Sequence, residues 1–218
     1  MAGRQADDDC WTRGHRAFAV DLNRPVSAAH TGRVQDEAQS RPTVRAATVG
    51  DAPAIAAIGS VGFPAVHNAI VGPAFAAAVV EQTYSIVALT ECIRRCAQDE
   101  SAEFLVAELD GEVLGYLHYD CEAAEAELHR IYVDLKRKRA GIGSALMGEL
   151  HARLPRGSSY ILLVAALNTE AQAFYQRHGL VIERRVDGNS HYSAAMDLEL
   201  DSPPQAADAL LMRFTKDT

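Results

Sequence analysis

The sequence predicts an α/β domain in which a mixed sheet carries helices on both faces. Strand-like and helix-like patterns alternate between Thr43 and Leu198. Two short turns, Asp110-Gly111 and Asp187-Gly188-Asn189, each lie between apolar runs and indicate β-hairpins. The run 160–166 is continuously apolar, as expected of a strand buried on both faces. These three observations define the expected class.

The individual elements follow in chain order. Asp51 is expected to cap a helix whose first turn holds Pro53. Apolar residues at helical spacing predict later helices, and Gly179 ends the last of them. The expected strands are 43–47, 104–109, 113–119, 128–133, 160–166, 180–186 and 191–198. One helix is expected to begin after Asp51. Three further helices are expected over 75–96, 144–154 and 169–178.

One folded domain with two tails is expected. A chain of 218 residues exceeds the usual domain length of about 150. Residues 1–41 have no hydrophobic period and as many Arg as acidic residues, so we expect a disordered tail there. Strand-like and helix-like patterns fall between these two tails, so the folded domain is expected over 42–200. Residues 201–218 open on Ser202-Pro203-Pro204 and are expected to form a C-terminal tail.

Charge and composition exclude several partners. A net charge of −8 argues against binding to nucleic acid or an anionic membrane. We find neither a secretory leader nor an apolar run close to the about 18 residues that span a bilayer, so a cytoplasmic location is expected. Of the four cysteines, Cys92 and Cys96 are spaced to share one helix face. We expect them to be small core residues rather than a metal or redox pair, because no other His or Cys pair completes four ligands.

The segment 128–144 indicates an anion site. A strand leads into four consecutive cations, Lys136 to Arg139, and then into Gly141-Ile142-Gly143 at the start of a helix. Free N–H groups at a helix start bind anions, so the loop is predicted to hold a phosphate or pyrophosphate. Leu146 stands where a dinucleotide fingerprint needs Gly, and Gly143 is not followed by the Lys of a nucleotide P-loop. The remaining alternative is a solvated basic turn.

A second motif makes the assignment specific. After the apolar strand come Asn168, Ala171, Phe174-Tyr175 and Gly179, in the pattern Asn-x-x-Ala-x-x-Phe-Tyr-x-x-x-Gly. Together with the glycine loop, the stretch 128–180 resembles the acetyl-CoA core of the GNAT superfamily of N-acetyltransferases. Two positions depart from the family pattern, namely Lys138 for the usual Arg or Gln and Leu180 for the usual Phe. Thr83-Tyr84-Ser85, with 128–133, is weakly similar to the polyamine-acetylating branch.

This resemblance implies a fold and a cosubstrate. The sheet would be largely antiparallel, with one parallel pair, 128–133 and 160–166, that splays apart. Acetyl-CoA would bind there without a metal, its pyrophosphate on the loop amides and its pantetheine arm between the two strands. The Val133 N–H would polarise the thioester carbonyl. The implied binding residues are Ile131, Val133, Lys138, Arg139, Ala140, Gly141, Ile142, Gly143, Ser144, Asn168 and Tyr175.

The resemblance also implies direct attack by a neutral amine. Tyr175 would protonate the departing thiolate, although a core aromatic is the alternative interpretation. Glu127 lies 11 residues before Lys138, the offset of the catalytic Glu in histone-acetylating members. Glu127 and His129 are expected to share one strand face with Ile131 and Val133, and either could accept the amine proton. A solvated carboxylate and a structural histidine are the alternatives.

The sequence allows several acceptors and three kinds of function. The first hypothesis is an N-acetyltransferase for a small-molecule or protein amine, with a homodimer allowed. A protein N-terminal or lysine acyltransferase is the second, and a non-catalytic acyl-CoA-binding regulatory module is the third. Acidic residues would either line the acceptor mouth and favour cationic amines or form a solvated hairpin loop. These residues are Asp120, Glu122, Glu125 and Glu127.

Overall fold

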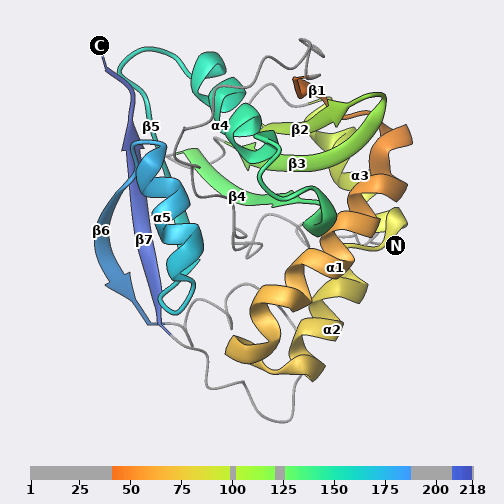
Figure 1. The fold of residues 1–218 in the computed structure, drawn as a ribbon, viewed down its shortest axis with the longest axis horizontal. Coiled ribbons are helices and arrows are strands. Elements are labelled where there is room, and N and C mark those ends of the chain that lie inside the picture. Colours follow the sequence, from red (N-terminus) through yellow and green to blue (C-terminus); the bar gives the residue numbers. More distant parts are fainter. Residues whose placement is uncertain (1–40, 99–101, 121–125, 188–207, 218) are drawn as a thin grey trace, which may run out of the picture.

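A single sheet with helices on both faces forms the described part of the computed structural model, which comprises residues 41–98, 102–120, 126–187 and 208–217 (Figure 1). The strands run in the order β1-β2-β3-β4-β5-β7-β6. They are β1 Thr43–Ala46, β2 Ala102–Leu109, β3 Glu112–Asp120, β4 Ala126–Val133, β5 Ser159–Ala165, β6 Val181–Val186 and β7 Ala209–Thr215. The helices are α1 Ala52–Val71, α2 Pro73–Thr83, α3 Ile86–Cys96, α4 Ile142–Arg153 and α5 Thr169–Arg177. Every strand pair is antiparallel except β4 and β5, which confirms the expected mixed class.

Two hydrophobic cores lie on opposite faces of this sheet. Because successive strand residues point to opposite faces, Phe104 and Tyr116 join the core under α1, α2 and α3. Their neighbours Leu105 and Leu117 join the core under α4 and α5. The turn between β2 and β3 has positive φ at both Asp110 (54°) and Gly111 (81°), as a two-residue hairpin turn requires. The hairpin predicted there is confirmed.

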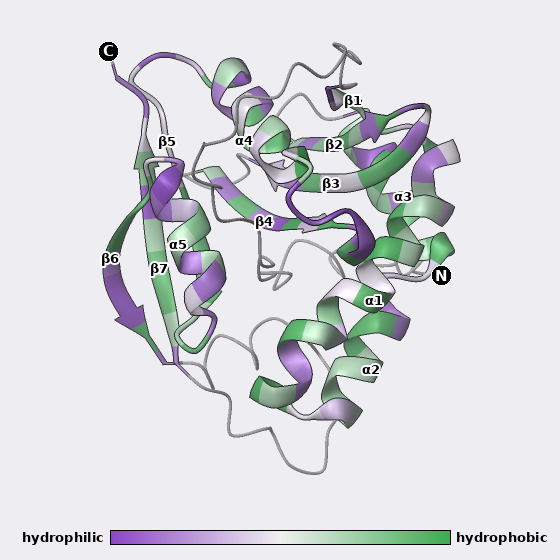
Figure 2. Ribbon diagram, viewed as in Figure 1, coloured by the Kyte–Doolittle hydropathy of each residue, from purple (hydrophilic) through white to green (hydrophobic). Residues whose placement is uncertain are grey.

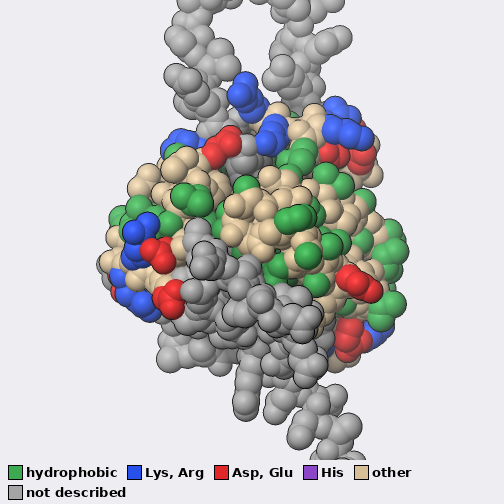
Figure 3. All heavy atoms as spheres, turned by 90° about the horizontal axis from the view of Figure 1, so that it is seen from below, with side chains coloured by type: hydrophobic (Ala, Val, Ile, Leu, Met, Phe, Trp, Pro, Cys, Tyr) green, Lys and Arg blue, Asp and Glu red, His purple; other side chains and the backbone are tan. Residues whose placement is uncertain are grey.

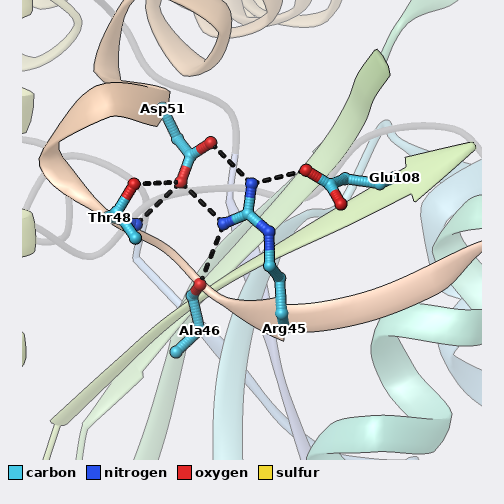
Figure 4. A network of polar contacts seen from close by, with 5 residues as sticks. All are labelled: Arg45, Ala46, Thr48, Asp51 and Glu108. Carbon is cyan, nitrogen blue, oxygen red and sulfur yellow. Dashed lines mark hydrogen bonds and ion pairs between the residues drawn. The ribbon is translucent and has the colours of Figure 1, made fainter. Parts of the chain in front are cut away.

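An Arg45 network ties β1 to the start of α1 and to β2 (Figure 4). The Arg45 guanidinium donates two hydrogen bonds of 2.8 Å to the Asp51 carboxylate and a third to Glu108. Asp51 also accepts from the Thr48 N–H at 2.7 Å. Asp51 precedes α1 as predicted, but its carboxylate makes no cap bond to that helix because Arg45 and Thr48 occupy it.

The single helix expected over 75–96 is two helices. α2 ends at Thr83, and α3 begins at Ile86 after Ser85 caps it. The Ser85 hydroxyl accepts from the Ala88 N–H at 3.2 Å, which satisfies one of the open donors at the helix start. The apolar period continues across this break, so the period alone did not reveal it.

α1 is longer and more apolar than expected. By length and composition alone, Val49–Val71 could cross a membrane, which corrects the expectation that no apolar run is long enough. In this fold α1 packs on β3 and β4, where Ile55 and Phe63 are buried. Figure 3 shows apolar side chains exposed on the side where α1 and α2 lie. Val61 of α1 is itself 58% exposed. Of the apolar window, 39% is buried inside the fold, so packing on the sheet accounts for part of this apolar character.

The C-terminal segment is not a tail. β7 lies within the sheet, paired with β5 from Ser159↔Thr215 to Ala165↔Ala209 and with β6 on its other side. The expected boundary at 200 is therefore wrong, because the apolar stretch of β7 completes the sheet. The strand expected at 191–198 and the tail expected over most of 1–41 lie outside the described residues.

Candidate functional site

A gap opens between the two parallel strands. β4 and β5 pair only at Ala126↔Tyr160 and Glu127↔Ile161, although both strands continue beyond these residues. Figure 1 shows the strands diverging from there. The backbone of β4 from Leu128 onward pairs with β3 on one side and has no β5 partner on the other. Such unpaired N–H and C=O groups must find another partner, and an extended ligand can supply one. The expected splayed pair is confirmed.

The cationic loop leads from this gap into α4. Asp134 accepts from the Lys136 N–H at 2.8 Å and holds the first turn of the loop. Positive φ values at Arg139 (70°) and Gly141 (76°) then turn the chain into the helix. The four cations Lys136 to Arg139 are exposed, and Figure 2 shows this connection as a hydrophilic segment.

The start of α4 is open toward an anion. Gly141 occupies the N-cap position, and no side chain caps the helix. The first N–H groups of a helix have no partner within it, so those of Ile142, Gly143 and Ser144 are directed out of the helix end. A Cβ at Gly141 would meet no atom within 4 Å, so there is space in front of the helix. Geometry and charge together suit a pyrophosphate.

Gly115, which the sequence interpretation did not single out, sets how closely α4 approaches the sheet. A Cβ on this β3 residue would lie 2.7 Å from Ile142 Cγ2 and 3.0 Å from the Tyr132 carbonyl oxygen. The first turn of α4 therefore packs directly on β3 and β4 because residue 115 has no side chain. An isolated glycine inside a strand pattern was the available signal.

Tyr175 lies on α5, directly after β5. The Asn168 side chain caps that helix, accepting from the Ala171 N–H at 3.1 Å. The Tyr175 side chain is fully buried, and its hydroxyl has no hydrogen-bond partner among the described residues. Burial, with a smaller effect of Tyr160, raises the pKa of Tyr175 well above its usual value. The phenol is therefore protonated at neutral pH and has a proton to donate.

The two candidate bases lie together on β4. His129 Nε2 contacts the Asp120 carboxylate, and His129 Nδ1 is 3.9 Å from Glu127 Oε1. All three side chains are between 12% and 18% exposed, so each is only partly accessible to water. Glu127 is also the last β4 residue paired with β5, so it marks the closed end of the gap.

The expected common face of these bases with Ile131 and Val133 is wrong. The pairing of β3 with β4 shifts register between His118 and Tyr119, which is a β-bulge. As a result the side chains of Ile131 and Val133 join the α4–α5 core, whereas the His129 ring lies on the other side, 5.0 Å from the His118 ring. The backbone of Ile131 and Val133 still borders the gap.

A buried cation next to these groups was also missed. Arg130 is 1% exposed and lies over the rings of Tyr84 (5.5 Å) and Phe104 (5.7 Å). Its Nη2 is 3.7 Å from Cys92 Sγ, and no carboxylate of the described residues pairs with it. An arginine inside the predicted strand was the signal. Of the acidic set, Asp120 and Glu127 are described, while Glu122 and Glu125 lie outside the described residues.

Comparison with known proteins agrees with this architecture. Residues 100–181, from the start of β2 to the start of β6, match the sequence model of the acetyltransferase (GNAT) domain. A search of curated protein sequences finds no significant match.

Several solved structures share the fold. PaiA N-acetyltransferase from Thermoplasma acidophilum, in complex with coenzyme A, is 18% identical over 81% of this chain and 99% of that chain, with a TM-score of 0.61. Ribosomal-protein-alanine N-acetyltransferase from Brucella melitensis is 23% identical over 79% and 99%, with a TM-score of 0.58. Spermidine/spermine N-acetyltransferase SpeG from Vibrio cholerae is 17% identical over 80% and 92%, with a TM-score of 0.55. At these identities the likeness establishes the fold.

Proposed function

We propose that this protein transfers an acetyl group from acetyl-CoA to a primary amine, because residues 100–181 match the sequence model of the acetyltransferase (GNAT) domain. The transfer occurs by direct attack while both substrates are bound. The observation that carries the proposal is the gap between β4 and β5, which leads to the open start of α4. A pantetheine arm ending in a pyrophosphate has the shape and charge that these two features accept.

Each part of the cosubstrate has a matching part of the chain. The N–H groups from Arg139 to Ser144 bind the pyrophosphate, and the cations at 136–139 add favourable charge. The unpaired β4 backbone at Ile131 and Val133 binds the pantetheine. Asn168, which follows β5, hydrogen-bonds the pantetheine.

The chemistry requires proton transfers at the attacking nitrogen and at the leaving sulfur. The ammonium of the acceptor loses a first proton to Glu127 or His129, and the neutral nitrogen attacks the thioester carbon. The Val133 N–H stabilises the negative charge that develops on the carbonyl oxygen. When the C–S bond breaks, the Tyr175 hydroxyl donates its proton to the thiolate, and the second proton that the nitrogen loses as it becomes the neutral amide restores the Tyr175 hydroxyl. Asp120 holds the His129 ring in place through its contact with Nε2.

The acceptor is a small-molecule or protein amine rather than nucleic acid or lipid. The net charge of −8 supports this limit, and a cytoplasmic location supplies acetyl-CoA. Asp120 and Glu127 give the site a negative edge that favours an ammonium group. The similar structures include enzymes named for spermidine and for a ribosomal-protein alanine, so both kinds of acceptor are included in the test.

The test measures thiol release from acetyl-CoA with pooled polyamines, amino acids and N-terminal or lysine peptides, and it identifies products by mass. We expect at least one amine to gain an acetyl group. Tyr175→Phe is expected to bind acetyl-CoA normally and to lower kcat by about 10²-fold or more. Tight acetyl-CoA binding without turnover of any amine would instead favour the acyl-CoA-binding regulatory module.

A further inference from the structure

Two cysteines and a histidine from different elements meet between α3 and the sheet. Cys92 and Cys96 lie one turn apart on α3, and His118 comes from β3. Their ligand atoms, two sulfurs and one imidazole nitrogen, all lie within 4.8 Å of one another. Within this cluster, Cys92 Sγ and His118 Nε2 are 3.9 Å apart.

We propose that Cys92, Cys96 and His118 bind one Zn²⁺ ion, with water in the fourth position. Thiolate sulfur and imidazole nitrogen are the ligands that zinc prefers in proteins, and three protein ligands plus water complete a tetrahedron. Zinc bonds of the usual lengths place a sulfur and a nitrogen ligand about 3.6 Å apart in a tetrahedron. The 3.9 Å separation needs only a small side-chain rotation to reach that value.

A metal fits this pair of cysteines better than a disulfide does. Residues four apart on a helix have Cβ atoms about 5–6 Å apart. A disulfide requires Cβ atoms about 3.5–4.5 Å apart, so closing one here would distort α3. Two thiolates bound to one ion reach toward a common centre and leave the helix intact. The third ligand, His118, is 26 residues along the chain from Cys92 and reaches the cluster only through the fold.

The surroundings of the cluster support metal-bound thiolates. Arg130 Nη2 lies 3.7 Å from Cys92 Sγ, in position to donate an N–H···S hydrogen bond. Hydrogen bonds of this kind orient metal ligands and tune their charge. Two thiolates balance the charge of the ion, so the buried Arg130 faces a neutral centre rather than an uncompensated dication. Cys92 and His118 are buried, while Cys96 is half-buried and gives an ion a way in.

Zinc binding here is separate from acetyl transfer, which itself needs no metal. The site is next to the candidate bases, because the His118 and His129 rings are 5.0 Å apart. Binding can therefore be tested without any acceptor and without turnover.

The experiment uses the full chain, stripped with a chelator and then titrated with Zn²⁺ against a chromophoric competitor. Elemental analysis after desalting is expected to give one zinc per chain. Substitution with Co²⁺ is expected to give a thiolate-to-cobalt charge-transfer band and the intense d–d bands of a tetrahedral site. Cys92→Ser, Cys96→Ser and His118→Gln are each expected to weaken binding by at least about 10²-fold, which is the upper end of what losing an outer hydrogen-bond partner costs.

Cys10→Ser and Cys121→Ser, at positions outside the described residues, are the matched controls, because they remove a thiol that is not one of the three proposed ligands. Both are expected to bind zinc as the wild type does. Cys96→Ser, at the half-buried position, keeps the test valid if a change at Cys92 prevents folding. The proposal is overturned if the wild type shows no charge-transfer band, or if folded Cys96→Ser keeps the wild-type affinity.

Discussion

Replacing Gly115 with Ala tests how closely α4 must approach the sheet for acetyl-CoA to bind. The new Cβ would lie 2.7 Å from Ile142 Cγ2, against an ordinary carbon contact of about 3.5–4.0 Å. It would also lie 3.0 Å from the Tyr132 carbonyl oxygen, a backbone atom that cannot rotate away. The first turn of α4 therefore has to move outward by about 1 Å.

Two measurements follow from this displacement. Overpacking of this kind costs about 1–3 kcal/mol, so urea denaturation should show a loss of that size in the free energy of unfolding for Gly115→Ala. Calorimetry should show weaker acetyl-CoA binding, because the N–H groups of Ile142 and Gly143 move with the helix start.

Gly148→Ala, on α4 itself, is the control for Gly115→Ala. A Cβ at Gly148 would meet no atom within 4 Å, so the change removes only the helix penalty of glycine. It is expected to raise the free energy of unfolding by about 1 kcal/mol and to leave acetyl-CoA affinity unchanged. If Gly115→Ala loses stability but binds acetyl-CoA as tightly as the wild type, the packing of α4 on Gly115 does not set the site.

Four further outcomes are expected. Gly143→Asp places a carboxylate at the helix start, so acetyl-CoA should no longer raise its Tm; a rise equal to that of the wild type would move the site elsewhere. Glu127→Gln should lower kcat by about 10²-fold or more if Glu127 accepts the amine proton, and an unchanged kcat would leave His129 as the candidate. The hydrogen bonds from Arg45 lower the pKa of Asp51 to about 2, below its unfolded value. The stabilisation is thus present above about pH 4 and is lost as pH falls toward 2, so Asp51→Asn should flatten the acid side of the stability curve measured by urea denaturation. Deleting residues 1–41 should leave Tm and activity nearly unchanged, and a large fall in Tm would mean that this segment packs on the domain.

Local signals predicted those parts of the fold that depend on a few neighbouring residues. The hairpin at Asp110-Gly111 follows from the positive φ that its turn requires. The uncapped start of α4 follows from Gly141, because a glycine N-cap leaves the same open N–H groups in any fold. The gap between β4 and β5 was predicted only through the family resemblance.

Features that depend on distant contacts were missed. The bulge opposite His118 and Tyr119, where β4 has one extra residue, turns Ile131 and Val133 to the other core, and strict alternation along a strand does not indicate a bulge. The apolar period continues through Ser85, but two helices form there, because the Ser85 hydroxyl caps the start of α3. The position of β7 depends on pairing with β5 more than 40 residues earlier in the chain. His118 joins the two cysteines only when β3 lies under α3.

The position of β7 also orders the assembly of the sheet. β6 precedes β7 in the chain, yet β7 lies between β5 and β6, so β6 can join the rest of the sheet only together with β7 or after it. Bringing β7 to β5 closes a long loop, which is a slow step in folding. Until that step, the free edge of β5 exposes a row of unpaired backbone groups next to an apolar strand. Such an edge is a template for pairing with another chain, so partly folded molecules of this protein are most prone to aggregate there.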